Sequence, residues 1–366
     1  MLPKALRYGL FDRMSIKTMR YIESVPYKQA TGLVRQIYDQ IHDDFFVNGS
    51  LTSHSRVPEL LAGVWTGGRE TILVSDRLDK TTKFAMTATL SRFNDCPYCG
   101  DMLVSLVHGS GEHEAAAQIF SEAEEQIADP KLRERLAWVA AIATNGPDRP
   151  APFTPEELPE AVGSLLAMGH INRFSHVAMD GSPVTAPLGL QRFKAAGLKV
   201  FGSELKDTSQ LEIAPGRSLS LLPDAPLPDD LAWAHPNPRI AAALARWAAA
   251  IDRHTTLAVS SAARAVVEDS LQQWVGDRMP LSRNWVEQEI AGLRGKDRDI
   301  ARLALVAAKA PYQVDDTLVA GVMGPEGDQE RLIRVLAWAA FSAARRVAAL
   351  TATAAIRSSG AVEVAA

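Results

Sequence analysis

The only two cysteines of this 366-residue chain lie in the sequence Cys96-Pro97-Tyr98-Cys99. Such a C-x-x-C pair serves as a redox-active dithiol, as half of a zinc site or as a redox sensor. The two preceding residues, Asn94 and Asp95, are types that cap helix N-termini, and proline suits the first helical position. The pattern therefore predicts that both cysteines lie in the first turn of a helix.

A helix N-terminus constrains the chemistry of a thiol as well as the fold around it. We expect this helix to run from Cys96 to about His108. Its unpaired N–H groups and its dipole favour a thiolate, which is the nucleophilic form of cysteine. The alternative interpretation is a pair of small buried residues whose thiols are inert.

Helical periodicity dominates the rest of the chain. Apolar residues recur at three- and four-residue spacing, and no segment of the first half alternates as a half-buried strand would. The sequence therefore predicts an all-α fold. The expected helices cover residues 28–45, 60–65, 71–78, 80–93, 96–108, 114–127, 130–145, 159–177, 188–198, 240–247, 258–274, 303–309 and 328–350.

Composition excludes several classes of protein. Hydrophobic residues make up 47% and charged residues 22% of the chain, which is typical of a soluble globular protein. The net charge is −4 and no dense Lys/Arg cluster occurs, so we expect no nucleic-acid partner. Two cysteines are too few for a secreted disulfide scaffold, and the N-terminus lacks a signal-peptide pattern. Arg345 and Arg346 interrupt the apolar stretch 336–356, so we expect no membrane span and a cytoplasmic location.

The chain divides into two halves whose helical patterns follow the same order. We expect a first domain, a proline-rich linker and a second domain over residues 1–180, 181–237 and 238–366. Residues 302–308 match residues 135–141 almost position by position, so we predict a tandem duplication. Chance similarity between alanine-rich helices is the alternative. The second copy has no cysteine at the corresponding residues 274–280, and we therefore regard it as degenerate.

Residues 90–95, Leu-Ser-Arg-Phe-Asn-Asp, end one predicted helix, and Cys-Pro-Tyr-Cys opens the next. This arrangement resembles the carboxymuconolactone decarboxylase and alkylhydroperoxidase D superfamily, and the arm with Tyr38, Pro58 and Trp65 resembles its longer, peroxidase-related members. The resemblance implies a tandem pair of alkylhydroperoxidase D-like helical bundles, in a family that associates as trimers or hexamers. It also implies a thiol-dependent oxidoreductase that reduces hydroperoxides through a dithiol/disulfide cycle, with an external thiol reductant and without a cofactor or metal.

In the thiol-active members of that superfamily, the second cysteine attacks the hydroperoxide and the first resolves the resulting sulfenic acid. The resemblance thus assigns the attack to Cys99 and the resolution to Cys96, which we expect to be the more exposed thiol. Those members also relay protons through a glutamate twelve positions before the first cysteine and a histidine four after the second. This chain has Phe84 and Leu103 there. His108, farther along the cysteine helix, is the candidate replacement.

Other interpretations of the motif stay open. Cys-Pro-Tyr-Cys is also the glutaredoxin signature, but the helical segment before it does not fit a thioredoxin-like context. A zinc site would add His108 and His113 to the cysteines, although a continuous helix places His108 too far from Cys96. The absent relay groups and the cysteine-free second copy favour a different class, a non-thiol role on the same scaffold. Such a protein would be a decarboxylase- or lyase-like enzyme, or a helical binding protein that has lost catalysis.

Two further polar groups are candidates for binding a small molecule. One lies on the last helix of the first half, and the other lies in the cysteine-free copy, where it would bind an acidic ligand. The first group comprises His170, Asn172, Arg173 and His176. The second comprises Asp277, Arg278 and Arg283. A polar helix face and a surface ion pair are the respective alternatives.

The predicted helices also bear on assembly. Many of them carry apolar residues on more than one face, which a lone bundle would leave exposed. We therefore predict a homo-oligomer, a trimer or a dimer, in which the two copies occupy pseudo-equivalent positions. Light scattering at micromolar concentration should give the mass of two or three chains, whereas a single species of 39.6 kDa would contradict the prediction.

Overall fold

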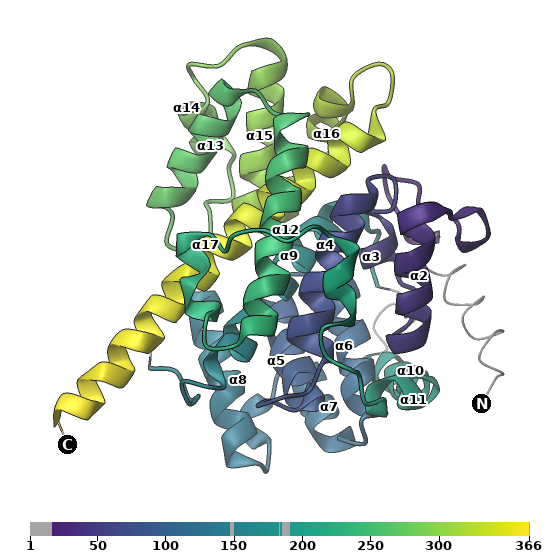
Figure 1. Cartoon of the computed structure of the whole chain (residues 1–366), viewed down its shortest axis with the longest axis vertical. Coiled ribbons are helices and arrows are strands. Elements are labelled where there is room, and N and C mark those ends of the chain that lie inside the picture. The colour runs from purple at the N-terminus through teal and green to yellow at the C-terminus, as the bar shows by residue number, and fades with distance from the viewer. Residues whose placement is uncertain (1–16, 147–149, 183, 185–190, 366) are drawn as a thin grey trace.

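The computed structural model describes residues 17–146, 150–182, 184 and 191–365 (Figure 1). These residues form helices and no strand, and the one isolated β-bridge among them pairs Met19 with Met179. The prediction of an all-α fold is therefore confirmed. Nothing in these helices tests the tandem duplication or the three domain boundaries directly, and both stay predictions.

The helices of the first half surround the cysteine pair. In chain order they are η1 (Tyr27–Gln29), α2 (Gly32–Asp44), α3 (Gly49–Thr52), α4 (Pro58–Gly68), the π-helix η2 (Arg69–Leu73), α5 (Lys80–Phe93), α6 (Pro97–Gly109), α7 (His113–Phe120), η3 (Glu124–Gln126), α8 (Pro130–Asn145) and α9 (Leu158–Ala178).

The segment between the halves and the second half are helical as well. Their helices are α10 (Gln191–Glu204), α11 (Lys206–Gln210), η4 (Arg217–Leu221), η5 (Asp229–Ala234), α12 (Pro238–Thr256), α13 (Ser261–Gln273), α14 (Asn284–Glu289), α15 (Gly295–Lys309), η6 (Pro311–Gln313), α16 (Asp316–Met323) and α17 (Gln329–Ala365). In Figure 1, α13 to α16 form one end of the molecule, α5 to α8 lie at the other, and α17 runs diagonally between them.

Capping residues explain why the two helices that flank the cysteines were predictable. Asp79 precedes α5 and accepts a hydrogen bond from the Thr82 N–H at 2.8 Å, so the helix begins at Lys80 as predicted. Neither Asn94 nor Asp95 caps α6: Cys96 is its N-cap and makes no side-chain capping bond, while Pro97 occupies the first position as predicted. Both helices therefore have the expected bounds to within one residue.

Two predicted helices were wrong in part. The helix expected over residues 71–78 ends at Leu73, because the wider turns of the π-helix η2 end α4 and Val74 is already extended. The helix expected over residues 114–127 is interrupted after Phe120, where Glu122 adopts a positive φ of 59° that no α-helix accommodates. The helix predicted over residues 188–198 begins among residues that the structure does not describe. Its described part, α10, runs from Gln191 to Glu204 and so ends later than predicted.

The second half packs on the first through pairs of corresponding helices. Helix α12 lies against α4, and α17 lies against α9. The first contact depends on Gly63 and Gly67, because the indole of Trp247 occupies the space where their side chains would be. Buried apolar residues of both halves belong to one continuous core. The two halves therefore share one core and are held together along these two helix pairs.

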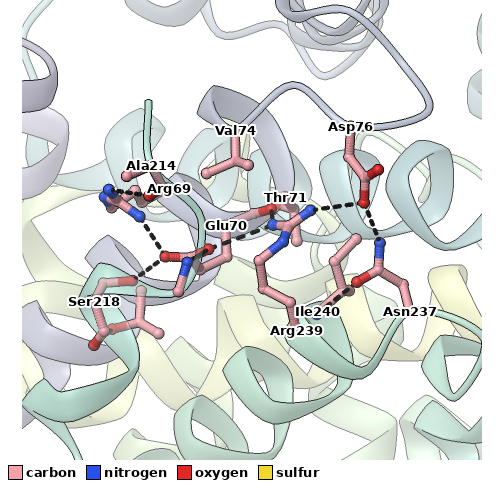
Figure 2. Close-up of polar contacts among 12 residues, drawn as sticks. Arg69, Glu70, Thr71, Val74, Asp76, Ala214, Ser218, Asn237, Arg239 and Ile240 are labelled. Atoms are coloured by element: carbon pink, nitrogen blue, oxygen red, sulfur yellow. Dashed lines mark hydrogen bonds and ion pairs between the residues drawn. The ribbon is translucent and has the colours of Figure 1, made fainter. Parts of the chain in front are cut away.

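A buried polar network fixes the π-helix, the intervening segment and α12 together (Figure 2). At its centre, the fully buried Glu70 carboxylate accepts hydrogen bonds from Arg69 at 2.5 Å, Ser218 at 2.7 Å and the Gly216 N–H at 2.9 Å. Arg239 at the start of α12 lies 3.4 Å from the same carboxylate. Arg69 and Glu70 begin the π-helix, and both side chains are fully buried. Each charge stabilises the other, because an unpaired buried charge is costly.

The segment predicted to be a linker contributes to the core as well as to the surface. Leu198, Leu205 and Leu231 are fully buried, and the Ser218 carbonyl accepts a hydrogen bond from Thr66 of α4. The described prolines of this segment separate its short helices, because proline lacks the backbone N–H that an α-helix needs.

Helix α17 contains the apolar stretch that the sequence analysis judged a poor membrane span. Its residues 329–358 are long and apolar enough to cross a membrane, but most of that stretch is buried inside the protein. The helix lies against α9, α12 and α15. Its composition is therefore that of a core helix, and alanine allows the close packing.

The contact between α4 and α12 yields a stability test. A Cβ on Gly67 would lie 2.1 Å from Cε3 of Trp247, which is fully buried and has no room to move. We expect Gly67→Ala to lower the free energy of unfolding by about 1–3 kcal/mol through overpacking, as measured by denaturant titration. The neighbouring Gly68→Ala is the matched control, because no atom lies within 4 Å of its added Cβ. Equal stability of the two variants would contradict this packing.

Candidate active site

The two cysteines lie at the N-terminus of α6, where the sequence predicted them. Asp95 adopts a left-handed φ of 52°, which aspartate tolerates, and this turn separates α5 from α6. The Cys96 side chain is 2% exposed and that of Cys99 is 3% exposed. The expectation that Cys96 would be the more accessible thiol is therefore wrong. A helix N-terminus is usually open to solvent, but here α9 packs against α6, and α3 contacts the motif through Gly49 and Ser50.

The two thiols form a directed pair. Both cysteines are free, and the Cys96 thiol donates a hydrogen bond to Cys99 Sγ over 2.7 Å. Cys96 is held by its own N–H, which donates to the Ser91 carbonyl at 2.9 Å. The donor is thus anchored in the turn between the helices, and the acceptor lies one helical turn inside α6.

The environment separates the acidities of the two thiols. Burial, together with the hydrogen bond to Cys99, raises the pKa of Cys96 well above its ordinary value. Burial also acts to raise the pKa of Cys99, but hydrogen-bond donors outweigh it and the pKa of Cys99 is lowered. Those donors are Cys96, Asn172, Ser175 and Ser50. Cys99 is therefore the more acidic thiol of the pair.

Helix α9 and the short helix α3 supply these donors. Asn172 is oriented by two bonds of 2.9 Å, since it donates to Ser91 Oγ and accepts from Asn94 Nδ2. The Ser175 hydroxyl is buried and makes no hydrogen bond to another described residue, and its interaction with Cys99 helps to lower the pKa of that thiol. Ser50 lies in α3, and the Tyr98 hydroxyl accepts the Gly49 N–H at 3.1 Å, which fixes α3 over the motif.

Cys99 opens on a cavity of about 80 Å³ between α3, α4, η2, α6 and α9. Its walls are almost entirely apolar and include Trp65, Phe84, Leu103 and Met168. Phe84 and Leu103 are the residues at the two positions where the resembling superfamily has its relay glutamate and histidine. Both positions thus line the cavity on which Cys99 opens, and both carry apolar side chains that cannot transfer a proton.

The structure does not bring His108 to the cysteines. It lies at the far end of α6, about 13 Å along the helix axis from Cys99 at the usual rise per residue. Its Nδ1 lies 3.2 Å from Nδ1 of His113, and burial together with the charge of His113 lowers the pKa of His108 to about 4. Among the described residues, no group of three His, Cys, Asp or Glu side chains gathers as metal ligands would.

The polar residues predicted on α9 lie in different parts of the structure, and not all of them are near the cysteines. His170 is buried, and its Nε2 lies 3.3 Å from Nε2 of His54 beside Trp247, away from the cavity lining. Burial lowers the pKa of both imidazoles, that of His54 to about 3, so both are neutral at physiological pH. His176 lies near the backbone of Asp95, one residue before Cys96. Asn172 is thus the member of this predicted group that reaches the thiols.

The second polar group lies at the surface of the cysteine-free copy. Arg278 is exposed and pairs with Asp95 of the first half, and Arg283 pairs with Asp315 at 2.8 Å. The backbone carbonyl of Asp277 accepts a hydrogen bond from the Trp274 indole at 2.9 Å. Exposed pairs of this kind contribute about 0–1 kcal/mol, so they agree with the surface-ion-pair alternative.

Fold and site together define an all-α protein with a buried cysteine pair at a helix N-terminus. The chain is 33% identical over 346 residues to Alkyl hydroperoxide reductase Rv2159c of Mycobacterium tuberculosis, and the match covers 91% of this chain and 94% of the relative. The chain therefore belongs to the same family as this alkyl hydroperoxide reductase. No model of a known protein family matches the chain, and no solved structure matches it.

The hydrogen-bond donors around Cys99 can be tested one at a time. Ser175→Ala removes a donor to the thiolate, so we expect the pKa of Cys99 to rise by about one unit. The measurement is a pH titration of thiolate absorbance on the reduced protein. Ser110→Ala, at the other end of α6, is the matched control, because that hydroxyl bonds only the Leu106 carbonyl and should leave the titration unchanged. An unchanged pKa in the Ser175 variant would contradict the arrangement.

Proposed function

We propose that this protein is a thiol peroxidase that reduces alkyl hydroperoxides through its Cys96–Cys99 pair. The observation that carries the proposal is the orientation of the pair: Cys99, whose pKa is lowered, lines the apolar cavity, and Cys96 donates a hydrogen bond to it. The name of the relative, an alkyl hydroperoxide reductase, supports the same chemistry. We further propose membership of the alkylhydroperoxidase D-like superfamily, with a degenerate second copy.

The reaction begins with attack of the Cys99 thiolate on the outer oxygen of the hydroperoxide. An S–O bond forms, the O–O bond breaks, and the alkoxide leaves while Cys99 becomes a sulfenic acid. Cys96 then attacks the sulfur of Cys99, which forms the disulfide and releases hydroxide, protonated by solvent. An external dithiol returns two electrons and two protons. A cytoplasmic location would supply such reductants.

Cys96 is the proton donor in this scheme. The leaving alkoxide needs a proton, and the apolar side chains of Phe84 and Leu103 have none to give. The raised pKa of Cys96 keeps its proton in place until the alkoxide forms. Transfer of that proton produces the Cys96 thiolate, which is the form that attacks the sulfenic acid. One residue thus serves as acid and as resolving nucleophile, and the missing relay groups predict a slow peroxidase.

The cavity favours an apolar substrate. Its hydrocarbon walls gain by burying an alkyl or aryl group, whereas hydrogen peroxide gains nothing there. The burial of both thiols also limits access to the disulfide, so the reductant must be small or the turn at Asp95 must open.

A non-thiol role on the same scaffold is the alternative. The apolar residues Phe84 and Leu103 at the relay positions and the cysteine-free second copy favour it, because neither feature assists thiol chemistry. A lyase-like enzyme or a binding protein would use the same cavity without oxidising a cysteine. The thiols would then be structural.

Cysteine variants decide between these functions. On treatment with cumene hydroperoxide, Cys96→Ser should accumulate a sulfenic acid on Cys99, trapped by a dimedone-type reagent and located by mass spectrometry. Cys99→Ser should consume no hydroperoxide. The intact protein should turn over cumene hydroperoxide at least tenfold faster than hydrogen peroxide, because of the cavity. Full activity in both cysteine variants would transfer the function to the non-thiol alternative.

Asp277→Ala is the matched control for this experiment. Asp277 belongs to the cysteine-free copy, and its described hydrogen bond uses the backbone carbonyl, which the substitution keeps. Turnover should stay within a few-fold of that of the intact protein. A loss as large as that of Cys99→Ser would mean that the active centre lies in the second half.

A further inference from the structure

A second cavity lies on the other side of the cysteine turn, between the first half and α17. It has a volume of about 50 Å³, and α5, α8, α9 and α17 provide most of its walls. Most of the lining is aliphatic, from residues such as Leu165, Leu166 and Val347, but Asn94, Arg173 and Thr351 also face it. It shares no lining residue with the cavity at Cys99.

Arg173 is a cation without an acidic partner among the described residues. Its Nε–H donates to the Ala308 carbonyl at 2.8 Å and one Nη1–H to the Gly169 carbonyl at 2.9 Å. A guanidinium has five N–H groups, so three have no hydrogen-bond acceptor among the described residues, and the guanidinium lies over the Trp274 ring, 5.8 Å from its centroid. Burial lowers the pKa of Arg173 to about 10, which still leaves it charged at neutral pH. The residue is half-buried, and no anion pairs with its charge in the described part of the chain.

Thr351 supplies a second, independent observation at the same place. Its side chain is 2% exposed, and its hydroxyl has no hydrogen-bond partner in the described part of the chain. Buried hydroxyls are nearly always paired in folded proteins, and one that lines a cavity beside an unpaired arginine has a donor available for a ligand. Arg173 comes from α9 and Thr351 from α17, so the two halves complete this group of donors together.

We propose that this cavity binds a small monocarboxylate. The planar guanidinium pairs with both oxygens of a carboxylate, and the Thr351 hydroxyl adds a third donor. The aliphatic walls suit a short alkyl tail. At roughly 10–15 Å³ for each water-sized position, the cavity has room for about four such positions, which corresponds to acetate or propionate.

The site lies next to the dithiol, although it does not depend on the peroxidase chemistry. Asn94 lines the cavity, and its Nδ2 donates to Oδ1 of Asn172 at 2.9 Å. Asn172 is the residue that α9 presents to both thiols. Asn94 therefore links the lining of this cavity to the polar groups around the two thiols.

Isothermal titration calorimetry of the full-length protein tests the site. Acetate, propionate and hexanoate serve as probes at constant chloride concentration. We expect acetate and propionate to bind one per chain with a Kd on the order of 1 mM, and hexanoate at least tenfold more weakly because it exceeds the cavity. Thr351→Val, which keeps the shape and removes the hydroxyl, should raise the Kd about tenfold. Arg173→Lys keeps the charge without the planar fork and should raise it further.

Thr353→Val is the matched control, because Thr353 is exposed on the same helix and bonds only the Ala349 carbonyl. Its Kd for propionate should equal that of the intact protein. Absence of saturable binding to the intact protein would overturn the proposal, as would equal affinities in the Thr351, Thr353 and Arg173 variants. If the arginine variant does not fold, the comparison of the two threonine variants still decides the outcome.

Discussion

The enclosure of α9 is the constraint on which the rest of the structure depends. Its side chains are buried on nearly every face, so each polar group on it needs a partner inside the protein. Glu160 pairs with Lys83 at 2.7 Å with both side chains fully buried, and loss of either partner would leave a charge that costs about 3–5 kcal/mol. Asn172 and Ser175 find their partners at the cysteines. The dithiol therefore belongs to the same set of buried polar groups that fixes α9 in place.

The sequence was most informative where a local signal decides the structure. Asp79 and Pro97 begin α5 and α6 at the predicted residues, since capping depends on neighbours within one turn. The same signal placed Cys96 and Cys99 in the first turn of a helix. The family resemblance, and not a local signal, identified Phe84 and Leu103 as the residues at the relay positions, and both line the cavity on which Cys99 opens.

Features that depend on distant segments were not predictable in this way. Ser50 and Ser175 reach Cys99 from segments far away in the sequence, and serine in a helical pattern has no signature that marks it as a thiolate donor. The exposure of Cys96 was predicted wrongly because local pattern does not show which helices cover an N-terminus. The π-helix that ends α4 holds Arg69 and Glu70 of a buried ion-pair network whose partners include the distant Arg239, and no local pattern marks those partners.

The fit of Trp247 between Gly63 and Gly67 has a consequence for which substitutions such a chain tolerates. Helices α12 and α17 cover α4 and α9, so deletion of either would expose the first half to water. The second half is therefore needed for the shape of the site even though it holds neither cysteine. Substitutions that keep its volume should be tolerated away from this contact, whereas a side chain added at Gly63 or Gly67 should not be.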